Sequence, residues 1–241
     1  MRMRIPYIGD TMDFPPADEA SPEGIVAAGG RPTVERLVRA YARGIFPWPH
    51  EGLPLLWFSP DPRYVIVPSR CHVPTSLRKR MRRGEYEIRA DTAFTQVMEG
   101  CRDVPRPGQP GTWIDARMIE GYSALHRRGL AHSIEAWRDG ELVGGLYGVS
   151  LGRMFTGESM FARAPDASKI AFATLLGHFV AWGFDFVDCE VETDHLRRFG
   201  GERWPRALFL TELERAVAVP PRRGTWTLSM SPAEAVALLP R

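Results

Sequence analysis

The stretch His132-Ser-Ile-Glu-Ala-Trp-Arg138, Asp139-Gly140, Glu141-Leu-Val-Gly-Gly-Leu-Tyr-Gly-Val149 decides the fold of this chain. Asp-Gly between two runs rich in apolar residues is the strongest short signal for a β-hairpin. The region from Arg153 to Glu158 predicts a third antiparallel strand, and its neighbour from Ser168 to Trp182 predicts an apolar helix. An antiparallel meander followed by a helix is typical of an α+β layer architecture.

Further elements are predicted on both sides of this stretch. Asp91 and Asp115 each precede a helical pattern and are expected to be its N-cap, and Gly129 is expected to end the second of these helices. The remaining expected elements are strands at 64–67, 86–89 and 184–191 and a helix at 75–83, with one or two helices after residue 191.

Residues 1–62 read as a small N-terminal domain ahead of a main domain at 63–241. The segment is rich in Pro and Gly, which prevents long regular elements. It contains one helical window, Thr33 to Arg43, which Gly44 ends. Its aromatic residues must therefore pack on the main domain or on a ligand.

The composition is that of a globular protein. Of the 241 residues, 44% are hydrophobic and 25% charged, which excludes disorder, collagen and coiled coil as overall descriptions. The net charge is only +2, so nucleic acid binding would need a local basic patch.

Three cysteines, Cys71, Cys101 and Cys189, show neither a CxxC motif nor the spacing of a metal site. We therefore expect no disulfide framework and no structural zinc, and a reduced cytoplasmic location. The N-terminus has no signal-peptide pattern, and the most apolar stretch, 170–184, is too short for a membrane span. We expect no membrane association.

A basic cluster, Arg78-Lys79-Arg80-Met81-Arg82-Arg83, lies on the predicted helix at 75–83. It has no interleaved acids to pair with at i+4. Such a run is usually a solvated helix face, but a phosphate backbone is the obvious partner for so concentrated a charge.

Carboxylates occur at two predicted strand ends. Glu158 follows Phe155-Thr-Gly157 and could bind a cationic group, or could serve as a turn or capping residue. Asp188 and Glu190 lie on one face of the predicted strand 184–191. Two close carboxylates raise one pKa and suit a general base, but the residues by themselves favour two exposed acids that pair with arginines such as Arg197.

A glycine-rich run, Gly144-Gly-Leu-Tyr-Gly148, is a weak candidate for a phosphate loop because no strand–loop–helix context follows it. Glycines in an antiparallel strand more often mark bulges or close packing.

Seven motifs occur in this order: Gly44-Ile-Phe-Pro-Trp48, Trp57-Phe-Ser-Pro-Asp-Pro-Arg63, Gly111-Thr-Trp113-Ile, His132-Ser-Ile-Glu135, Leu142-Val-Gly-Gly-Leu-Tyr-Gly148, Gly157-Glu-Ser-Met-Phe161 and Asp166-Ala-Ser-Lys169. Together they resemble leucyl/phenylalanyl-tRNA–protein transferases, and the likeness covers about residues 24–209. The resemblance implies a GNAT-like (acetyltransferase-type) catalytic domain behind a small N-terminal α/β domain.

The resemblance also implies an activity. Leu or Phe, with Met as a further candidate, would pass from aminoacyl-tRNA to the N-terminal Arg or Lys of a protein and mark it for degradation. Neither a metal nor another cofactor is implied, and we expect a monomer. An aminoacyl ester is already activated, so attack by an amine chiefly needs positioning and a modest base.

Site residues follow from the same resemblance. Glu158 would hold the amino group of the substrate, and Asp188 would belong to a proton relay. Residues expected near the 3′-terminal adenosine are Trp48 and Trp113, and those expected around the Leu or Phe side chain are Leu146, Met160, Phe172, Leu175 and Phe179. The cluster Arg78, Lys79, Arg80, Arg82 and Arg83 would face the tRNA acceptor stem.

This chain departs from the family pattern at two positions. Glu190 stands where the family has Gln, and Arg31 stands where it usually has Asp. A carboxylate at 190 can act as a base directly, whereas an amide cannot.

Three alternative functions stay open. The first is tRNA-dependent transfer to a different amine, a small molecule or another peptide, which Glu190 favours. The second is an acyl-CoA-dependent N-acyltransferase, although the segment 164–168 offers an acid where a pyrophosphate would bind. The third is a tRNA-binding protein without catalysis.

Overall fold

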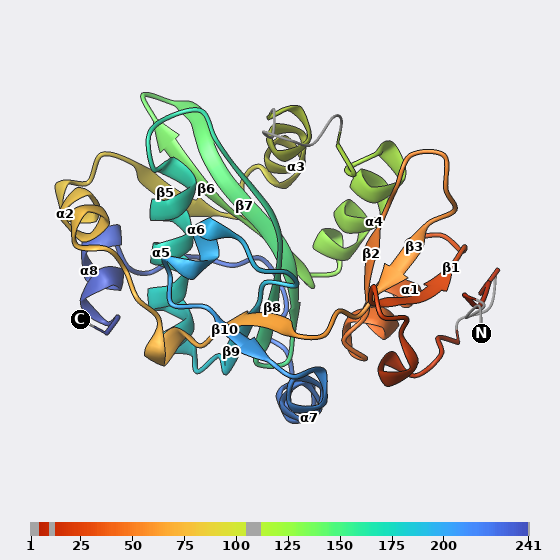
Figure 1. The fold of residues 1–241 in the computed structure, drawn as a ribbon. Coiled ribbons are helices and arrows are strands. Elements are labelled where there is room, and N and C mark those ends of the chain that lie inside the picture. Colours follow the sequence, from red (N-terminus) through yellow and green to blue (C-terminus); the bar gives the residue numbers. More distant parts are fainter. Residues whose placement is uncertain (1–4, 10–12, 105–111, 241) are drawn as a thin grey trace.

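A seven-stranded sheet and a three-stranded sheet form the frame of the computed structural model, which describes residues 5–9, 13–104 and 112–240 (Figure 1). The large sheet has the strand order β10-β4-β9-β8-β7-β6-β5 and the small one β1-β3-β2. The α+β prediction is confirmed. Gly111, the first residue of one motif, lies outside the described residues.

The strands are β1 (Ile25–Ala28), β2 (Phe46–Trp48), β3 (Leu56–Phe58), β4 (Arg63–Ile66), β5 (Glu87–Ala90), β6 (Ala131–Arg138), β7 (Glu141–Leu151), β8 (Met154–Ala162), β9 (Phe186–Asp188) and β10 (Glu202–Trp204). The α-helices are α1 (Val34–Tyr41), α2 (Thr75–Arg83), α3 (Phe94–Asp103), α4 (Ala116–Arg127), α5 (Ala167–Trp182), α6 (Asp194–Arg197), α7 (Arg206–Val217) and α8 (Pro232–Ala237). Two 3₁₀ turns are η1 (Ala17–Glu19) and η2 (Pro68–Arg70).

The predicted hairpin is confirmed. Arg138 of β6 pairs with Glu141 of β7, and the two turn residues have positive φ, 53° at Asp139 and 78° at Gly140. Two successive residues with positive φ make the turn whose twist suits a two-residue hairpin. The third strand, β8, is longer than predicted, because it continues through Glu158 to Ala162.

Helix α5 carries the chain from β8 to β9, which pairs with β8 in parallel. The helix matches the prediction to within one residue and is buried along most of its length. Strand β9 is shorter than the predicted 184–191. The chain leaves it after Asp188 because Glu190 adopts a left-handed backbone, with φ 61°.

The small sheet was not predicted strand by strand. Its strands have three or four residues each, as the density of prolines requires. Helix α1 is confirmed, with the Thr33 hydroxyl accepting a hydrogen bond from the Arg36 N–H at 3.3 Å. One buried cluster contains Leu37 and Trp57 together with Tyr122 and Tyr147, so the N-terminal region shares its core with α4 and β7.

The two predicted aspartate caps have different outcomes. Asp115 caps α4 and accepts a hydrogen bond from the Met118 N–H at 3.0 Å. The prediction for Asp91 is wrong: its carboxylate accepts from the Ser133 N–H at 3.0 Å and contacts His132. Glu135 instead accepts from the N–H groups that precede α3, because Asp91 has φ 59° and turns its side chain toward β6.

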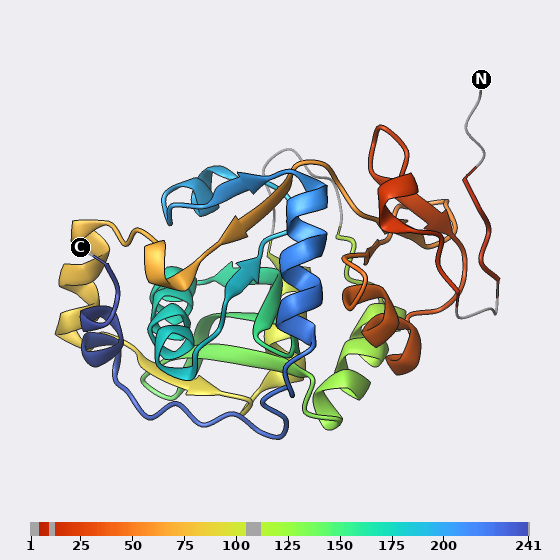
Figure 2. The ribbon, with the colours of Figure 1, turned by 90° about the horizontal axis from the view of Figure 1, so that it is seen from below.

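The C-terminal segment returns along the large sheet and ends beside α2 (Figure 2). There Arg78 is buried, and its guanidinium donates to the carbonyls of Val73, Val236 and Pro240. Arg78 therefore fastens α2 to α8. Among the residues that the structure covers, none of the helices combines the length and apolarity that crossing a bilayer requires.

Candidate active site

A β-bulge places Glu158. Tyr147 of β7 pairs with Ser159 of β8, and Gly148 pairs with Gly157, so Glu158 is the extra residue between the two pairs. A bulge bends its strand and re-aims a side chain. The expectation of a strand-end glutamate is thus wrong, whereas the interpretation of the glycine-rich run as a site of a bulge is confirmed.

Two tyrosines hold the carboxylate of Glu158. The Tyr41 hydroxyl donates to Oε1 at 2.6 Å and the Tyr122 hydroxyl donates to Oε2 at 2.8 Å, while the two hydroxyls also contact each other. Tyr41 comes from α1 and Tyr122 from α4, so Glu158 lies where three elements meet. Burial and, to a smaller extent, the charge of Asp188 raise the pKa of Glu158 to about 7, against the lowering effect of the two tyrosine hydrogen bonds.

Asp188 forms a buried ion pair with Arg63. The Nε and Nη2 atoms of Arg63 each lie 2.7 Å from one carboxylate oxygen, and both side chains are 1% exposed. The guanidinium lies between the rings of Phe46 and Phe209, 4.7 and 4.6 Å from their centroids. The alternative of an exposed acid paired with Arg197 is wrong, because Arg197 binds Glu192 and Asp194.

Glu190 completes the carboxylate cluster. Its N–H donates to Asp188 Oδ1 at 2.9 Å, and this contact holds the left-handed backbone that places its side chain near Glu158. Its Oε1 is buried and has no hydrogen-bond partner among the described residues. Burial raises the pKa of Glu190 well above its usual range, and the charges of Glu158 and Asp188 act in the same direction.

Three carboxyl groups therefore gather around one guanidinium. Arg63 can neutralise only one of them, and Asp188 occupies it in a bidentate pair. The charge of Glu158 raises the pKa of Glu190, and the charge of Asp188 raises the pKa of both glutamates, as neighbouring acids do. Such a pair can hold a cationic amine and can accept its proton near neutral pH.

No group of three or more His, Cys, Asp or Glu side chains in the described ranges is placed to hold a metal ion. Cys71, Cys101 and Cys189 are buried and form no disulfide in the part of the chain that the structure describes.

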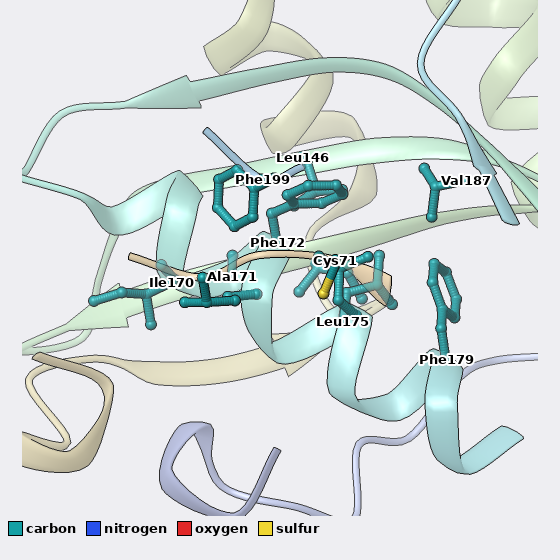
Figure 3. Packing of buried hydrophobic residues seen from close by; sticks show 14 of the residues in the cluster. Cys71, Leu146, Ile170, Ala171, Phe172, Leu175, Phe179, Val187 and Phe199 are labelled. Carbon is teal, nitrogen blue, oxygen red and sulfur yellow. The ribbon is translucent and has the colours of Figure 1, made fainter. Parts of the chain in front are cut away.

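The apolar residues expected around the donor side chain lie together (Figure 3). Leu146 of β7 and three residues of α5 belong to one buried cluster: Phe172, Leu175 and Phe179. Met160 pairs with Leu146 across the sheet and is partly exposed. Leu175 and Phe179 are fully buried, so the side chains fill this space in the present conformation.

Trp48 and Trp113 lie in another part of the molecule. Both are partly buried and pack against the cluster that joins the small sheet to α4. Trp48 also lies beside His50 and Phe58, with ring centroids 5.6 and 5.4 Å away.

The basic cluster on α2 is divided by the fold. Arg78 is buried, which corrects its assignment to a tRNA-facing surface. Arg80 binds Asp166 at 2.7 Å and also pairs with Glu85, so acids outside the helix supply the partners that the i+4 pattern lacked. The exposed cations are Lys79, Arg82 and Arg83. Helix α2 lies at the opposite end of the molecule from the small sheet (Figures 1 and 2).

Three residues of the site were not predicted from the sequence. Tyr41 and Tyr122 look like ordinary members of apolar helix faces, and only the fold shows that their hydroxyls meet Glu158. Arg63 ends the motif Trp57-Phe-Ser-Pro-Asp-Pro-Arg63, which was the one available signal.

Comparison with known proteins gives a consistent answer. Residues 65–214 match the profile of the leucyl/phenylalanyl-tRNA protein transferase family, and residues 30–61 match the profile of the N-terminal domain of those proteins. A leucyl/phenylalanyl-tRNA–protein transferase of Myxococcus xanthus is 61% identical over 89% of this chain and 92% of its own length. One of the same name from Oleidesulfovibrio alaskensis is 49% identical over 94% of this chain and 93% of its own length.

The raised pKa of Glu158 predicts a pH-dependent stability. In the unfolded chain this carboxyl ionises near 4.5 and in the folded chain at about 7. Between these values the folded state keeps a proton that the unfolded state has lost, so the free energy of unfolding falls as the pH rises through that window, by up to about 3 kcal/mol. Urea unfolding from pH 4.5 to 8 should show a clearly smaller fall in Glu158→Gln. Glu141→Gln, in the hairpin turn, is the matched control, and an identical pH slope in Glu158→Gln and wild type would contradict the assignment.

Proposed function

Because the chain belongs to the leucyl/phenylalanyl-tRNA protein transferase family, we propose that it moves Leu or Phe from aminoacyl-tRNA to the N-terminal Arg or Lys of a protein. The observation that carries this proposal is the cluster of the partly buried Glu158 and Glu190 beside the buried pair of Asp188 and Arg63. When its glutamates are ionised, the cluster carries more negative charge than Arg63 neutralises, which suits an acceptor whose N-terminus and first side chain are both cationic. Met is a further candidate donor residue.

We also propose that residues 63–241 form a GNAT-like catalytic domain behind the small domain of residues 1–62. Three features support this. Strands β5 to β8 are antiparallel, α5 crosses over to β9, which pairs with β8 in parallel, and β8 carries the bulge at Glu158.

The reaction needs one bond made, one bond broken and one proton moved. The acceptor amine attacks the ester carbonyl carbon, the new C–N bond forms, and the C–O bond to the tRNA ribose breaks. An amine proton passes to a carboxylate, and the ribose oxygen takes up a proton as it leaves. An N-terminal amine has a pKa of about 7.7–8.0, so a carboxylate with a raised pKa is a sufficient base.

We assign the proton acceptor to Glu190. Asp188 is engaged by Arg63 and by the Glu190 N–H, so it serves the relay by holding the backbone of its neighbour. The buried Oε1 of Glu190 has no partner in the described part of the chain and is available to an amine. Glu158, fixed by its two tyrosines, would hold the amino group of the donor residue.

The donor would be held at three places. The apolar cluster around Leu146, Met160 and α5 suits a Leu or Phe side chain and disfavours polar ones. Trp48 and Trp113, both partly exposed, offer faces for the terminal adenine. Lys79, Arg82 and Arg83 supply phosphate contacts on α2.

A different amine acceptor is the second candidate, and Glu190 favours it, because a carboxylate at this position changes the charge that an acceptor meets. An acyl-CoA donor is less well supported. Asp166 stands at the start of α5 and binds both Arg80 and Lys169, so a carboxylate occupies the place where a pyrophosphate would need free N–H groups.

Glu190→Gln tests the assignment of the base. We expect kcat/KM for transfer of radiolabelled Leu or Phe to Arg-starting and Lys-starting peptides to fall by about 10²-fold, because positioned general bases contribute at least that much. Peptides starting with Ala should accept little label from either protein. Glu192→Gln is the control on the same segment. Unchanged transfer in Glu190→Gln would show that an amide suffices, and absence of transfer by the wild type with tRNA still bound would favour a different acceptor.

The division of α2 predicts two separate effects. Lys79→Glu combined with Arg82→Glu and Arg83→Glu should weaken tRNA binding and reduce its salt dependence, with a smaller loss in the free energy of unfolding than Arg78→Ala causes, because these side chains are exposed. Arg78→Ala should lower that free energy by about 2 kcal/mol or more, because three carbonyls lose a charged donor. Filter binding and urea unfolding measure the two effects. Unchanged tRNA affinity in the triple variant would exclude α2 as the contact surface.

A further inference from the structure

The C-terminal strap, residues 219–231, inserts one tryptophan into the core of the large domain. It lies beyond residues 65–214, the part that matches the family profile. Trp226 is 2% exposed and belongs to the same buried cluster as the apolar residues of α5. Most of the strap has no regular secondary structure, so the buried indole is held in place by side-chain and backbone contacts.

Trp226 is held on three sides. Its N–H donates to Asp91 Oδ2 at 2.6 Å, and its Nε1–H donates to the Arg222 carbonyl at 3.1 Å. Its ring stacks on His132, with centroids 3.7 Å apart and planes 6° from parallel. Asp91 in turn binds His132, so the backbone and the ring of Trp226 are fixed by one buried pair.

The strap is fixed again beyond this tryptophan. His178 of α5 accepts hydrogen bonds at Nε2 from the N–H groups of Ser229 and Met230, both at 3.2 Å, while its Nδ1 contacts the Thr174 carbonyl. The ring of Trp226 therefore has little freedom to move away from α5.

This anchored ring is part of an aromatic cluster beside the residues expected to line the donor pocket, and the rings of Trp182 and Phe184 lie 5.2 and 6.0 Å from it. Trp226 contacts Phe179 and Phe155, with ring centroids 5.9 Å away in each case. Phe155 and Phe179 also contact each other, with centroids 5.3 Å apart. Phe179 is one of the α5 residues that would surround the Leu or Phe side chain, so Trp226 packs directly against the pocket wall.

We propose that Trp226 is a positioning residue that sets the depth of the donor side-chain pocket, and through it the choice between Leu and Phe. The inference rests on the proposed function. Trp226 braces Phe179 and does not itself contact the donor. A smaller side chain at 226 leaves a cavity into which the Phe179 ring can move, because cores relax only partly around a truncation. The pocket then deepens, and kcat/KM for larger donor side chains rises.

The test is donor choice in Trp226→Leu and Trp226→Phe. tRNAs charged with Leu, Phe or Trp are supplied to an Arg-starting peptide, and kcat/KM is measured for each. Apolar pockets discriminate by about 10- to 200-fold for small changes in size. We expect the Phe-to-Leu ratio of kcat/KM to rise about tenfold in Trp226→Leu. We also expect this variant to accept tRNA charged with Trp as a donor. The rise in Trp226→Phe should be smaller and in the same direction.

Trp57→Leu is the matched control, because it removes another fully buried indole, from the cluster around the small sheet. It should lower the thermal midpoint and leave the donor ratio unchanged. An equal fall in kcat/KM for Leu and for Phe in Trp226→Leu would overturn the inference, because it would show that Trp226 has a purely structural role. If Trp226→Leu does not fold, an unchanged ratio in Trp226→Phe overturns it equally. Failure of the proposed function would look different, since the wild type would then transfer neither donor.

Discussion

A guanidinium buried between two phenyl rings holds the site together. Arg63 begins β4, Asp188 ends β9, and the rings come from β2 and α7, so this one ion pair joins the small sheet, the large sheet and a C-terminal helix. A buried ion pair is costly to desolvate and is tolerated only with good geometry and further hydrogen bonds. Here the bidentate contact supplies the geometry, and the Glu190 N–H donates a further hydrogen bond to Asp188. Removal of either partner would leave a charge unpaired in the interior.

The same pair determines the state of the neighbouring acids. Because Asp188 takes up the charge of Arg63, Glu158 and Glu190 lack a cation of their own, and burial raises the pKa of both. The bulge at Glu158 and the left-handed backbone at Glu190 are the two irregularities that bring these carboxyls together. Strain of this kind is often kept where it serves a site. Here it produces an acidic centre in which the pKa values of both glutamates lie above their usual range.

Local signals in the sequence predicted the parts of the fold that depend on local interactions. The Asp139-Gly140 turn, α5 and the Asp115 cap follow from turn chemistry, periodicity and capping, and each was confirmed. The cap at Asp91 and the accessibility of Arg78 were predicted wrongly, because β6 and the C-terminal segment supply partners distant in sequence. The residues Glu158, Asp188 and Glu190 were named in advance, whereas Arg63 and the two tyrosines depend on contacts that no spacing shows.

The central claim is that two partly buried glutamates have raised pKa values beside an ion pair in which Asp188 already takes up the charge of Arg63. The most direct measurement is NMR titration of the glutamate side-chain carboxyl carbons in ¹³C-labelled protein, with Glu158→Gln and Glu190→Gln to assign the signals. We predict two signals that titrate well above the usual 4.5, that of Glu158 with a pKa of about 7, and a shift of each when the other glutamate is replaced. Ordinary titration of both carboxyls near pH 4.5 would contradict the account.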